Sequence, residues 1–377
     1  VELTATAANV TFGADNLFAG DTYFIDNHST QDFDLTSYDS DNFEGLDPAV
    51  LENNFRIEDK MHHRMDTDLP LTNGRITWTA ADQHYVTESG TDHSIQRAIA
   101  VAAAGDTVNV EAGVYDEYVN VSKTLYLLGA QRGVDARTRT GVPESELINA
   151  VKVTANNVTI DGFTVRDADQ VGDDGPGMYL PGTVSGTQVL NNIFRNNVFG
   201  LYLGNEGTDQ AVVQYNLFDS NNRPGAATGQ GVYSDQRLVN AVIEDNKFVN
   251  HDVYAIDLTG ELFRYFGKPG VGPVSNVTIT RNEISGTGMV ITGQCQTWYP
   301  GGMDTDLTIT DNVIVGPAAR GIFLQGVDDA IVAGNEISQV HSTSTSPGVG
   351  AAVFVYYASD RVIIDNNVLS DSDYGVK

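Results

Sequence analysis

The sequence predicts an all-β protein: a single-stranded right-handed parallel β-helix with an N-terminal capping helix and a less regular N-terminal region. Three observations predict this fold. From residue 151 onward, a short pattern of apolar residues and asparagine recurs in order seven times. The shortest interval, from Asn312 to Asn335, is 23 residues, which suits three short strands better than a strand-helix unit. The 38 glycines, among many Asn and Asp residues, indicate frequent tight turns.

The repeated unit has an aliphatic residue three positions before its asparagine and an apolar residue two positions after it, and later a Gly-apolar-any-apolar segment. The asparagines are Asn192, Asn216, Asn246, Asn282, Asn312, Asn335 and Asn367. If each turn rises by one inter-strand spacing of about 4.8 Å, these side chains stack and hydrogen-bond to one another. The preceding unit has Phe163 in the asparagine position. The ladder is therefore expected to begin one turn later.

The chain divides into a non-repetitive region, 1–90, expected to be a cap or a preceding module, and a β-helix over 91–377 that is truncated or continues at its C-terminal end. Within the first region, Asp47 and the apolar spacing that follows predict a helix down to Asp66. A second helix is predicted over 94–104, capped by Ser94 and stopped by Gly105. It would close the open end of the apolar core, as a solenoid requires.

Charge narrows the classes of partner. Fifty acidic residues against 21 basic ones give a formal charge of −29, which disfavours nucleic acid and indicates cations, saline surroundings, or substrates held by stacking and hydrogen bonds. No apolar run is long enough to span a bilayer. Cys295 is the single cysteine, so no internal disulfide is expected.

The predicted capping helix and first strands resemble the pectate-lyase-like right-handed β-helix superfamily, and the later repeats resemble its generic parallel β-helix units of secreted and cell-surface bacterial proteins. The resemblance rests on Ser94-Ile95-Gln96-Arg97-Ala98-Ile99, on Ala104-Gly105-Asp106-Thr107-Val108-Asn109-Val110, and on Gly113-Val114-Tyr115. It implies a polysaccharide partner for some members and no catalysis for others. The Gly-His-Gly, Arg-Ile-Lys, Gly-Tyr-Gln-Asp and Asp-Pro-His-Asp signatures of several enzymes in this group are absent.

The repeat register identifies an outward-facing position on the strand after each repeat glycine. We call the residues at this position the outer column; they are Tyr179, Tyr202, Tyr233, Asp257, Val290, Phe323 and Phe354. Aromatic side chains one turn apart form a continuous patch, and sugar rings stack on such faces. The alternative is a second core, in which loops or residues 1–90 cover the column.

Insertions fall just before and just after this strand, so they are expected to form two walls around the outer column. Their candidate substrate-binding residues are Trp298 and Tyr299, and two cationic residues, Arg264 and Lys268, belong to the same wall region. Loops on a rigid scaffold commonly carry function, although solenoids also tolerate loops that have none.

Asp257 interrupts the aromatic positions, and Asp235 occupies the next outward position of the preceding turn. Sheet geometry places the two diagonally, about 7 to 8 Å apart. That separation suits the acid and base of an inverting glycosidase, or a shared Ca²⁺. His251, Arg264 and Lys268 complete the candidate catalytic set, as a lyase base or as partners for a uronate. Two ordinary solvated carboxylates are the alternative.

Two further groups are candidate metal sites. Asp173 and Asp174 are candidate calcium ligands in a loop, although their spacing does not match an EF-hand. His62 and His63, with His84 and His93 nearby in sequence, suggest zinc, but adjacent histidines on a helix point in different directions.

The sequence therefore predicts an extracellular or cell-surface β-helix that recognises polysaccharide along an aromatic-floored groove, with lyase or inverting hydrolase activity left open and Ca²⁺ as the candidate cofactor. The alternative is a non-catalytic adhesive or spacer module of a larger surface protein.

Overall fold

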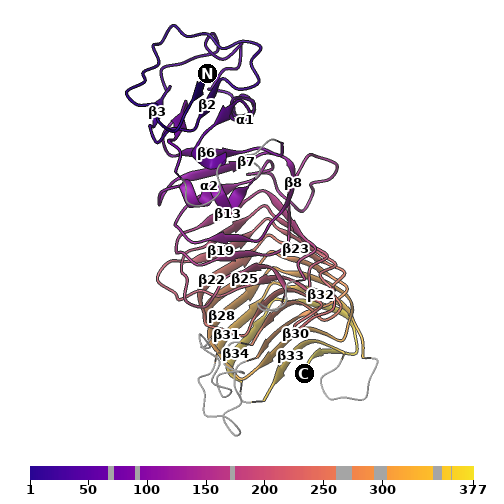
Figure 1. The fold of residues 1–377 in the computed structure, drawn as a ribbon. Helices are drawn as coiled ribbons and strands as arrows, with labels where there is room; N and C mark the ends of the chain where they lie inside the picture. The colour runs from indigo at the N-terminus through magenta and orange to yellow at the C-terminus, as the bar shows by residue number, and fades with distance from the viewer. Residues whose placement is uncertain are drawn as a thin grey trace.

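The computed structural model is a right-handed parallel β-helix with a small, less regular region stacked at its N-terminal end (Figure 1). It describes residues 1–66, 72–89, 94–169, 175–259, 274–292, 304–342, 350–357 and 359–377. Within these ranges no helix is long and apolar enough to cross a membrane. The predicted fold class is confirmed.

Three parallel sheets run the length of the coil, and each turn contributes one strand to each sheet. The first sheet contains β6 (Gln83–Val86), β7 (Thr107–Val110), β10 (Tyr126–Leu128), β13 (Thr159–Asp161), β16 (Gln188–Leu190), β19 (Ala211–Gln214), β22 (Leu238–Glu244), β25 (Val274–Thr280), β28 (Asp304–Thr310), β31 (Val327–Ala333) and β34 (Asp360–Asp365).

The second sheet contains β8 (Gly113–Asp116), β11 (Ser145–Ile148), β14 (Phe163–Arg166), β17 (Ile193–Arg195), β20 (Leu217–Asp219), β23 (Lys247–Val249), β26 (Glu283–Ser285), β29 (Val313–Ala318), β32 (Glu336–Val340) and β35 (Val368–Ser372). The third contains β9 (Val119–Val121), β12 (Val151–Val153), β15 (Pro176–Tyr179), β18 (Phe199–Tyr202), β21 (Gln230–Ser234), β24 (Tyr254–Leu258), β27 (Met289–Thr292), β30 (Arg320–Gln325), β33 (Ala351–Tyr356) and β36 (Tyr374–Val376).

The asparagine ladder is confirmed at the bend between the first and second sheets. From Asn192 to Asn335, the backbone N–H of each ladder asparagine donates to Oδ1 of the next one, over 2.8 to 3.0 Å. Phe163 donates its backbone N–H to Asn192 Oδ1, so the ladder begins one turn after Phe163, as predicted. The residue before each ladder asparagine has a left-handed backbone, as at Tyr215 with a φ of 57°. This conformation turns the chain, and the asparagine amides satisfy the backbone groups buried at the bend.

The interior of the coil is one continuous apolar cluster. It extends from Val86 and the buried face of α2 (Ile95–Val101) down to Val353. Stacked Phe194, Phe218 and Phe248 fill its middle, with ring centroids 4.9 and 4.7 Å apart. Ser94 caps α2 by accepting a hydrogen bond from the Arg97 backbone, as predicted, and the helix ends at Val101.

The N-terminal region has its own apolar cluster, rich in phenylalanine, around Phe24 and Phe43. Its strands are β1 (Glu2–Leu3), β2 (Ile25–Asn27) and β4 (Met61–His62) in one sheet, and β3 (Phe33–Asp34) with β5 (Ile76–Thr77) in another. The predicted long helix is wrong in extent. It covers only α1 (Leu51–Glu58), because the chain then turns into β4 and a 3₁₀ turn, η1 (Arg64–Asp66).

Candidate functional site

The outer column has the predicted register on the third sheet. Tyr179 pairs with Tyr202, Tyr202 with Tyr233 and Tyr233 with Asp257 on successive strands. The register continues through Val290 to Phe323 and Phe354. The residues that flank the column, such as Leu201 and Ile256, belong to the interior cluster. The column therefore points away from the interior, as the repeat pattern predicts.

The outer column was expected to expose its aromatic side chains to solvent, and this is wrong for three of its positions. Tyr202, Phe323 and Phe354 are only 3, 7 and 5 % exposed. They belong to two small apolar clusters outside the main interior, one around Tyr202 and one around Phe323 and Phe354. The alternative of a second core is therefore correct for these three rings. The strand pattern could not predict their burial, because burial depends on which other parts of the chain pack over them.

Partly exposed aromatic side chains remain beside the Tyr202 cluster. Tyr179 and Tyr233 are of intermediate exposure, with ring centroids 5.0 and 5.5 Å from that of Tyr202. The Lys152 ammonium lies 5.4 Å from the centroid of the Tyr179 ring. These rings form an aromatic surface bordered by a cation, which suits contact with a polar ring such as a sugar.

The structure brings Asp235 and Asp257 together beside these tyrosines. The Tyr202 hydroxyl donates a hydrogen bond to Asp235 Oδ1. Asp257 is 8 % exposed, and its Oδ1 is a buried oxygen with no hydrogen-bond partner among the described residues. Burial, and secondarily the negative charge of Asp235, raise the pKa of Asp257 to about 7. A carboxyl group that is half protonated near neutral pH can donate or accept a proton.

The two tyrosines respond to the same carboxylates. Burial first, and then the hydrogen bond to Asp235, raise the pKa of Tyr202. Burial, followed by the charges of Asp235 and Asp257, raises the pKa of Tyr233. Both phenols therefore stay protonated and act as hydrogen-bond donors at neutral pH. Together Tyr202, Tyr233, Asp235 and Asp257 form what we call the carboxylate site.

His251 does not join the carboxylate site. It is buried on the turn after β23, with its ring centroid 6.3 Å from that of Phe248. Burial lowers the pKa of its imidazole to about 4, opposed by the Phe218 backbone and the charge of Asp219. Neither Asp235 nor Asp257 is among the groups that change the pKa of His251. Its predicted role in catalysis has no support from this placement.

Several predicted residues lie outside the described residues. They are Arg264, Lys268, Trp298, Tyr299, Asp173 and Asp174. Their roles remain predictions.

Exposed tyrosines that sequence reasoning missed lie beside Phe354 at the C-terminal end of the coil. Tyr356 and Tyr357 are both well exposed, and the Tyr356 ring centroid lies 5.2 Å from that of Phe354. Tyr356 occupies the outward position two residues after Phe354, the same position that Asp235 holds relative to Tyr233. Following that second outward position through every turn would have identified Tyr356.

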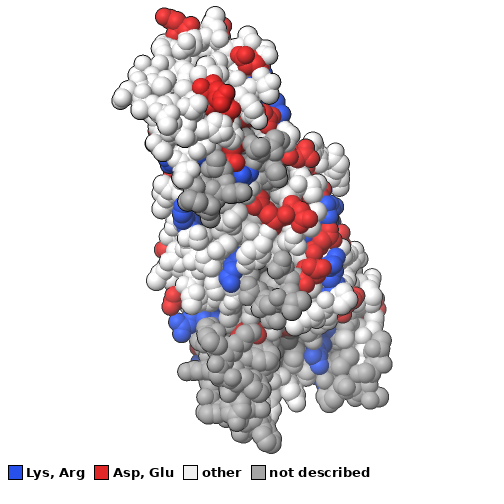
Figure 2. All heavy atoms as spheres, in the orientation of Figure 1, with Lys and Arg blue, Asp and Glu red and all other residues white. Residues whose placement is uncertain are grey.

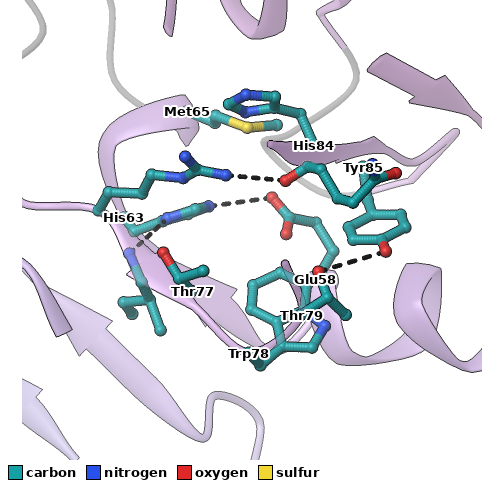
Figure 3. A pocket seen from close by; sticks show the side chains of 11 residues that line it. Glu58, His63, Met65, Thr77, Trp78, Thr79, His84 and Tyr85 are labelled. Atoms are coloured by element: carbon teal, nitrogen blue, oxygen red, sulfur yellow. Dashed lines mark hydrogen bonds and ion pairs between the residues drawn. The ribbon is translucent and has the colours of Figure 1, made fainter. Parts of the chain in front are cut away.

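The small cavity of the N-terminal region is a structural feature and not a substrate pocket. Its volume is about 10 Å³, room for about one water molecule. Figure 3 shows Glu58 and His63 facing each other inside it, with Nε2 3.0 Å from Oε1. Burial raises the pKa of Glu58 well above its usual range and lowers that of His63 to about 4. The two therefore form a neutral, hydrogen-bonded pair.

The histidines grouped by sequence as zinc ligands face different carboxylates. His62 faces Asp26, His63 faces Glu58 and His84 faces Asp106. His93 is outside the described residues. The predicted grouping is therefore wrong for His62, His63 and His84, because His62 and His63 lie on an extended segment and point to opposite sides.

Several known proteins are similar to this chain. A family described as periplasmic copper-binding protein (NosD) matches residues 271–377. The tailspike protein of E. coli bacteriophage HK620, solved in complex with a pentasaccharide, is 14 % identical, with a TM-score of 0.46 over 71 % of this chain and 51 % of that one. This chain thus spans about half the length of the tailspike chain. A mannuronic acid specific polysaccharide family 6 lyase from human gut microbiota is 12 % identical, with a TM-score of 0.35 over 76 % and 83 %.

No curated protein matches the chain. The predicted resemblance to right-handed parallel β-helix proteins is confirmed at the level of fold by the three parallel sheets of the coil.

The described residues within the NosD match do not fit a copper centre. His341 is the only histidine there, and its two nitrogens contact different carboxylates, with Nε2 3.3 Å from Asp371 and Nδ1 3.1 Å from Asp373. The Asp373 carboxylate, followed by the charge of Asp371, raises the pKa of His341. Met289, a soft sulfur donor, is fully buried in the apolar interior. These contacts describe an ion pair and not a converging ligand set.

Proposed function

We propose that this protein recognises polysaccharide on the outer face of its third sheet and hydrolyses a glycosidic bond there. The observation that carries the proposal is Asp257. Its carboxyl group lies on the outer face of the third sheet and is nevertheless buried. Its Oδ1 has no hydrogen-bond partner among the described residues, and the negative charge of Asp235 acts on it. Buried polar atoms are almost always hydrogen-bonded, and perturbed carboxyl groups concentrate at functional sites.

The carboxylate site supplies the two groups that an inverting glycosidase needs. Protonated Asp257 would donate its proton to the leaving oxygen as the bond to the anomeric carbon breaks. Asp235, held by the Tyr202 hydroxyl, would take a proton from the water that attacks this carbon from the opposite face. The diagonal placement implies a carboxyl separation of about 7 to 8 Å, within the range for an inverting mechanism. Tyr179 and Tyr233 offer ring faces for neighbouring sugars.

We also propose that the protein is located outside the cytoplasm. Long polysaccharides of the kind a solenoid face can accommodate are met at or beyond the cell surface, and the NosD family is described as periplasmic. An acidic carboxylate site favours neutral or cationic saccharides over polyuronates unless cations neutralise the surface.

A substrate panel tests the proposal. The full chain is incubated with neutral glucans, chondroitin, pectate and alginate, with and without calcium, while reducing ends and unsaturated products are measured. We expect new reducing ends from at least one polymer, loss of this activity in Asp257→Asn, and retained activity in Asp306→Asn, an exposed aspartate on the first sheet. Equal turnover in Asp257→Asn would refute the catalytic role.

A non-catalytic rigid module is the second candidate, because the rings of Tyr202, Phe323 and Phe354 are buried in clusters of their own. The same panel separates the two. Retention on one polymer without turnover indicates a binding module, and neither retention nor turnover indicates a spacer.

A further inference from the structure

Two histidines and an aspartate meet on one side of the small sheet in the N-terminal region. β2 and β4 are parallel neighbours, and their register places Asp26 opposite His62. His28 follows Asp26 by two residues, and alternate residues of an extended chain lie on the same side. Asp26, His28 and His62 are the one such group of three donors that converges within the described residues. Sequence spacing alone does not bring His28 and His62 together.

The donor atoms of these three residues converge. Asp26 Oδ1 lies 2.8 Å from His28 Nε2 and 2.8 Å from His62 Nδ1. All three atoms lie within 4.8 Å of one another, and the imidazole centroids are 4.8 Å apart. Despite the short distances, Asp26 Oδ1 and His62 Nδ1 are buried atoms with no correctly directed hydrogen bond among the described residues. Such an arrangement suits atoms that point at a common centre instead of at one another.

Two imidazole nitrogens and one carboxylate oxygen form a ligand set for a borderline metal ion. Zinc binds nitrogen and oxygen at about 2.0 to 2.2 Å, so tetrahedral donors stand about 3.3 Å apart. The two 2.8 Å contacts would have to open by roughly half an ångström, which small side-chain rotations supply. Calcium prefers six to eight oxygens and fits this set poorly.

The site is reachable from solvent and lies on a strongly acidic molecule. The side chains of His28, Asp26 and His62 are 46, 25 and 16 % exposed. On the face shown in Figure 2, acidic side chains occur from the N-terminal region down the coil. A formal charge of −29 raises the local concentration of divalent cations.

We propose that Asp26, His28 and His62 bind one divalent transition-metal ion of the zinc and copper class, with at least one coordination position open to solvent. The ion joins β2 to β4 and stabilises the N-terminal region. Residues 26–62 lie outside the stretch that matches the NosD family, so this site is independent of that similarity. It is also independent of the carboxylate site.

Metal titration of the full chain tests this proposal. After chelator treatment and desalting, Zn²⁺ binding is measured by calorimetry, Co²⁺ binding by visible absorption, and the melting temperature with and without Zn²⁺. We expect one Zn²⁺ per chain, a Co²⁺ spectrum typical of four or five ligands, and a higher melting temperature with metal. Millimolar Ca²⁺ should not displace the Zn²⁺.

Variants assign the ligands. Two single variants, His28→Gln and His62→Gln, should each weaken Zn²⁺ binding at least about tenfold. His28→Gln changes the most exposed ligand. His341→Gln is the matched control, because His341 also lies between two carboxylates but at the other end of the coil. It should bind Zn²⁺ as the wild type does. Circular dichroism without metal checks that each variant is folded.

Three outcomes would overturn the proposal. They are no saturable Zn²⁺ binding, equal binding in folded His28→Gln and His62→Gln, or displacement by Ca²⁺ at similar concentration. The last two would indicate cation adsorption to the acidic surface, and the first an ion-paired His-Asp-His cluster.

Discussion

Asp257 occupies a position where the fold does not require a carboxyl group. In the same column, Tyr233 precedes it and Val290 follows it, and both are compatible with the same strand pairing. Ionising a buried carboxyl group costs free energy, which is why its pKa is raised. A chain selected for stability alone would place a neutral side chain there, and the acid at this position therefore supports the proposed function.

Asp257→Asn should therefore stabilise the protein at alkaline pH. The folded-state pKa of about 7 lies above the unfolded value of 3.8, so wild-type stability falls as pH rises between these values. Replacing the acid by an amide removes this loss. We expect a gain of about 1 to 3 kcal/mol at pH 8 and a much smaller difference at pH 4. Urea unfolding at both pH values measures it, and destabilisation at pH 8 would contradict the assigned environment.

His251 should contribute a pH dependence of opposite sign. Its pKa is about 4 in the folded protein, against an ordinary value of 6.5, so unfolded chains bind more protons between these values. Its contribution is fully present above about pH 6.5 and is lost as pH falls toward 4. His251→Gln should flatten the acid limb of the stability curve.

His341→Gln is the control for that measurement. The pKa of His341 is raised, so its contribution is present at low pH and lost as pH rises. Equal acid limbs in wild type and His251→Gln would contradict the burial of a neutral His251.

Among elements, the bend between the first and second sheets depends most on side-chain chemistry. The side chain of each ladder asparagine donates from Nδ2 to a carbonyl oxygen of the preceding turn and accepts at Oδ1 from a backbone N–H of that same turn, as Asn246 does with Val213 and Asn216. The carboxamide carries both functions on a short side chain, which alanine lacks.

Asn246→Ala should destabilise the coil by about 2 to 3 kcal/mol, because it leaves buried backbone groups of two turns unpaired. Glu336→Ala, at an exposed position on β32 with an ordinary backbone conformation, is the control and should change stability by less than about 0.5 kcal/mol. Chemical unfolding of both variants gives the comparison. Similar losses would show that the ladder is not a special source of stability.

The glycine at the start of the third-sheet strand allows close approach between turns. A Cβ added to Gly231 would lie 2.6 Å from the Ala255 carbonyl oxygen and 2.6 Å from Phe248 Cδ1. Gly231→Ala should therefore cost about 1 to 3 kcal/mol through overpacking. Gly13→Ala has open space around its Cβ and should be nearly neutral. Equal melting temperatures for both variants would contradict this tight packing.

Sequence periodicity predicted the ladder and the outer column because both follow from one repeated register. It could not predict that Tyr202 is buried, since its covering comes from elsewhere in the fold. The non-repetitive region, 1–90, gave a weaker basis for predicting secondary structure. A spacing consistent with a helix continued through Met61 and Met65, but strand pairing of β4 with β2 replaces the helix there. The convergence of Asp26, His28 and His62 depends on that pairing and has no signal in sequence.

At the scale of the whole molecule, the fold is a long coil with a large acidic excess. One interior cluster extends through most of its turns, and a second cluster holds the N-terminal region. β6 lies within residues 1–90 but pairs with β7, so the first sheet begins at Gln83. The division near residue 90 remains a prediction about independent folding.

Screening should stabilise the whole molecule, because a formal charge of −29 opposes compaction. Between about 0.01 and 1 M NaCl the Debye length falls from about 30 to 3 Å. The melting temperature should rise over that range, and KCl should act equally. A constant or falling melting temperature would show that the acidic surface is already neutralised locally.

The ionisation of Asp257 tests the functional account most directly. Carbon-13 labelling of aspartate carboxyl groups, with Asp257→Asn to identify the resonance, allows its titration to be followed by NMR. We predict a midpoint near pH 7. A midpoint near the ordinary value of 3.8 would mean a solvated carboxylate, and the proposed acid of the carboxylate site would be lost.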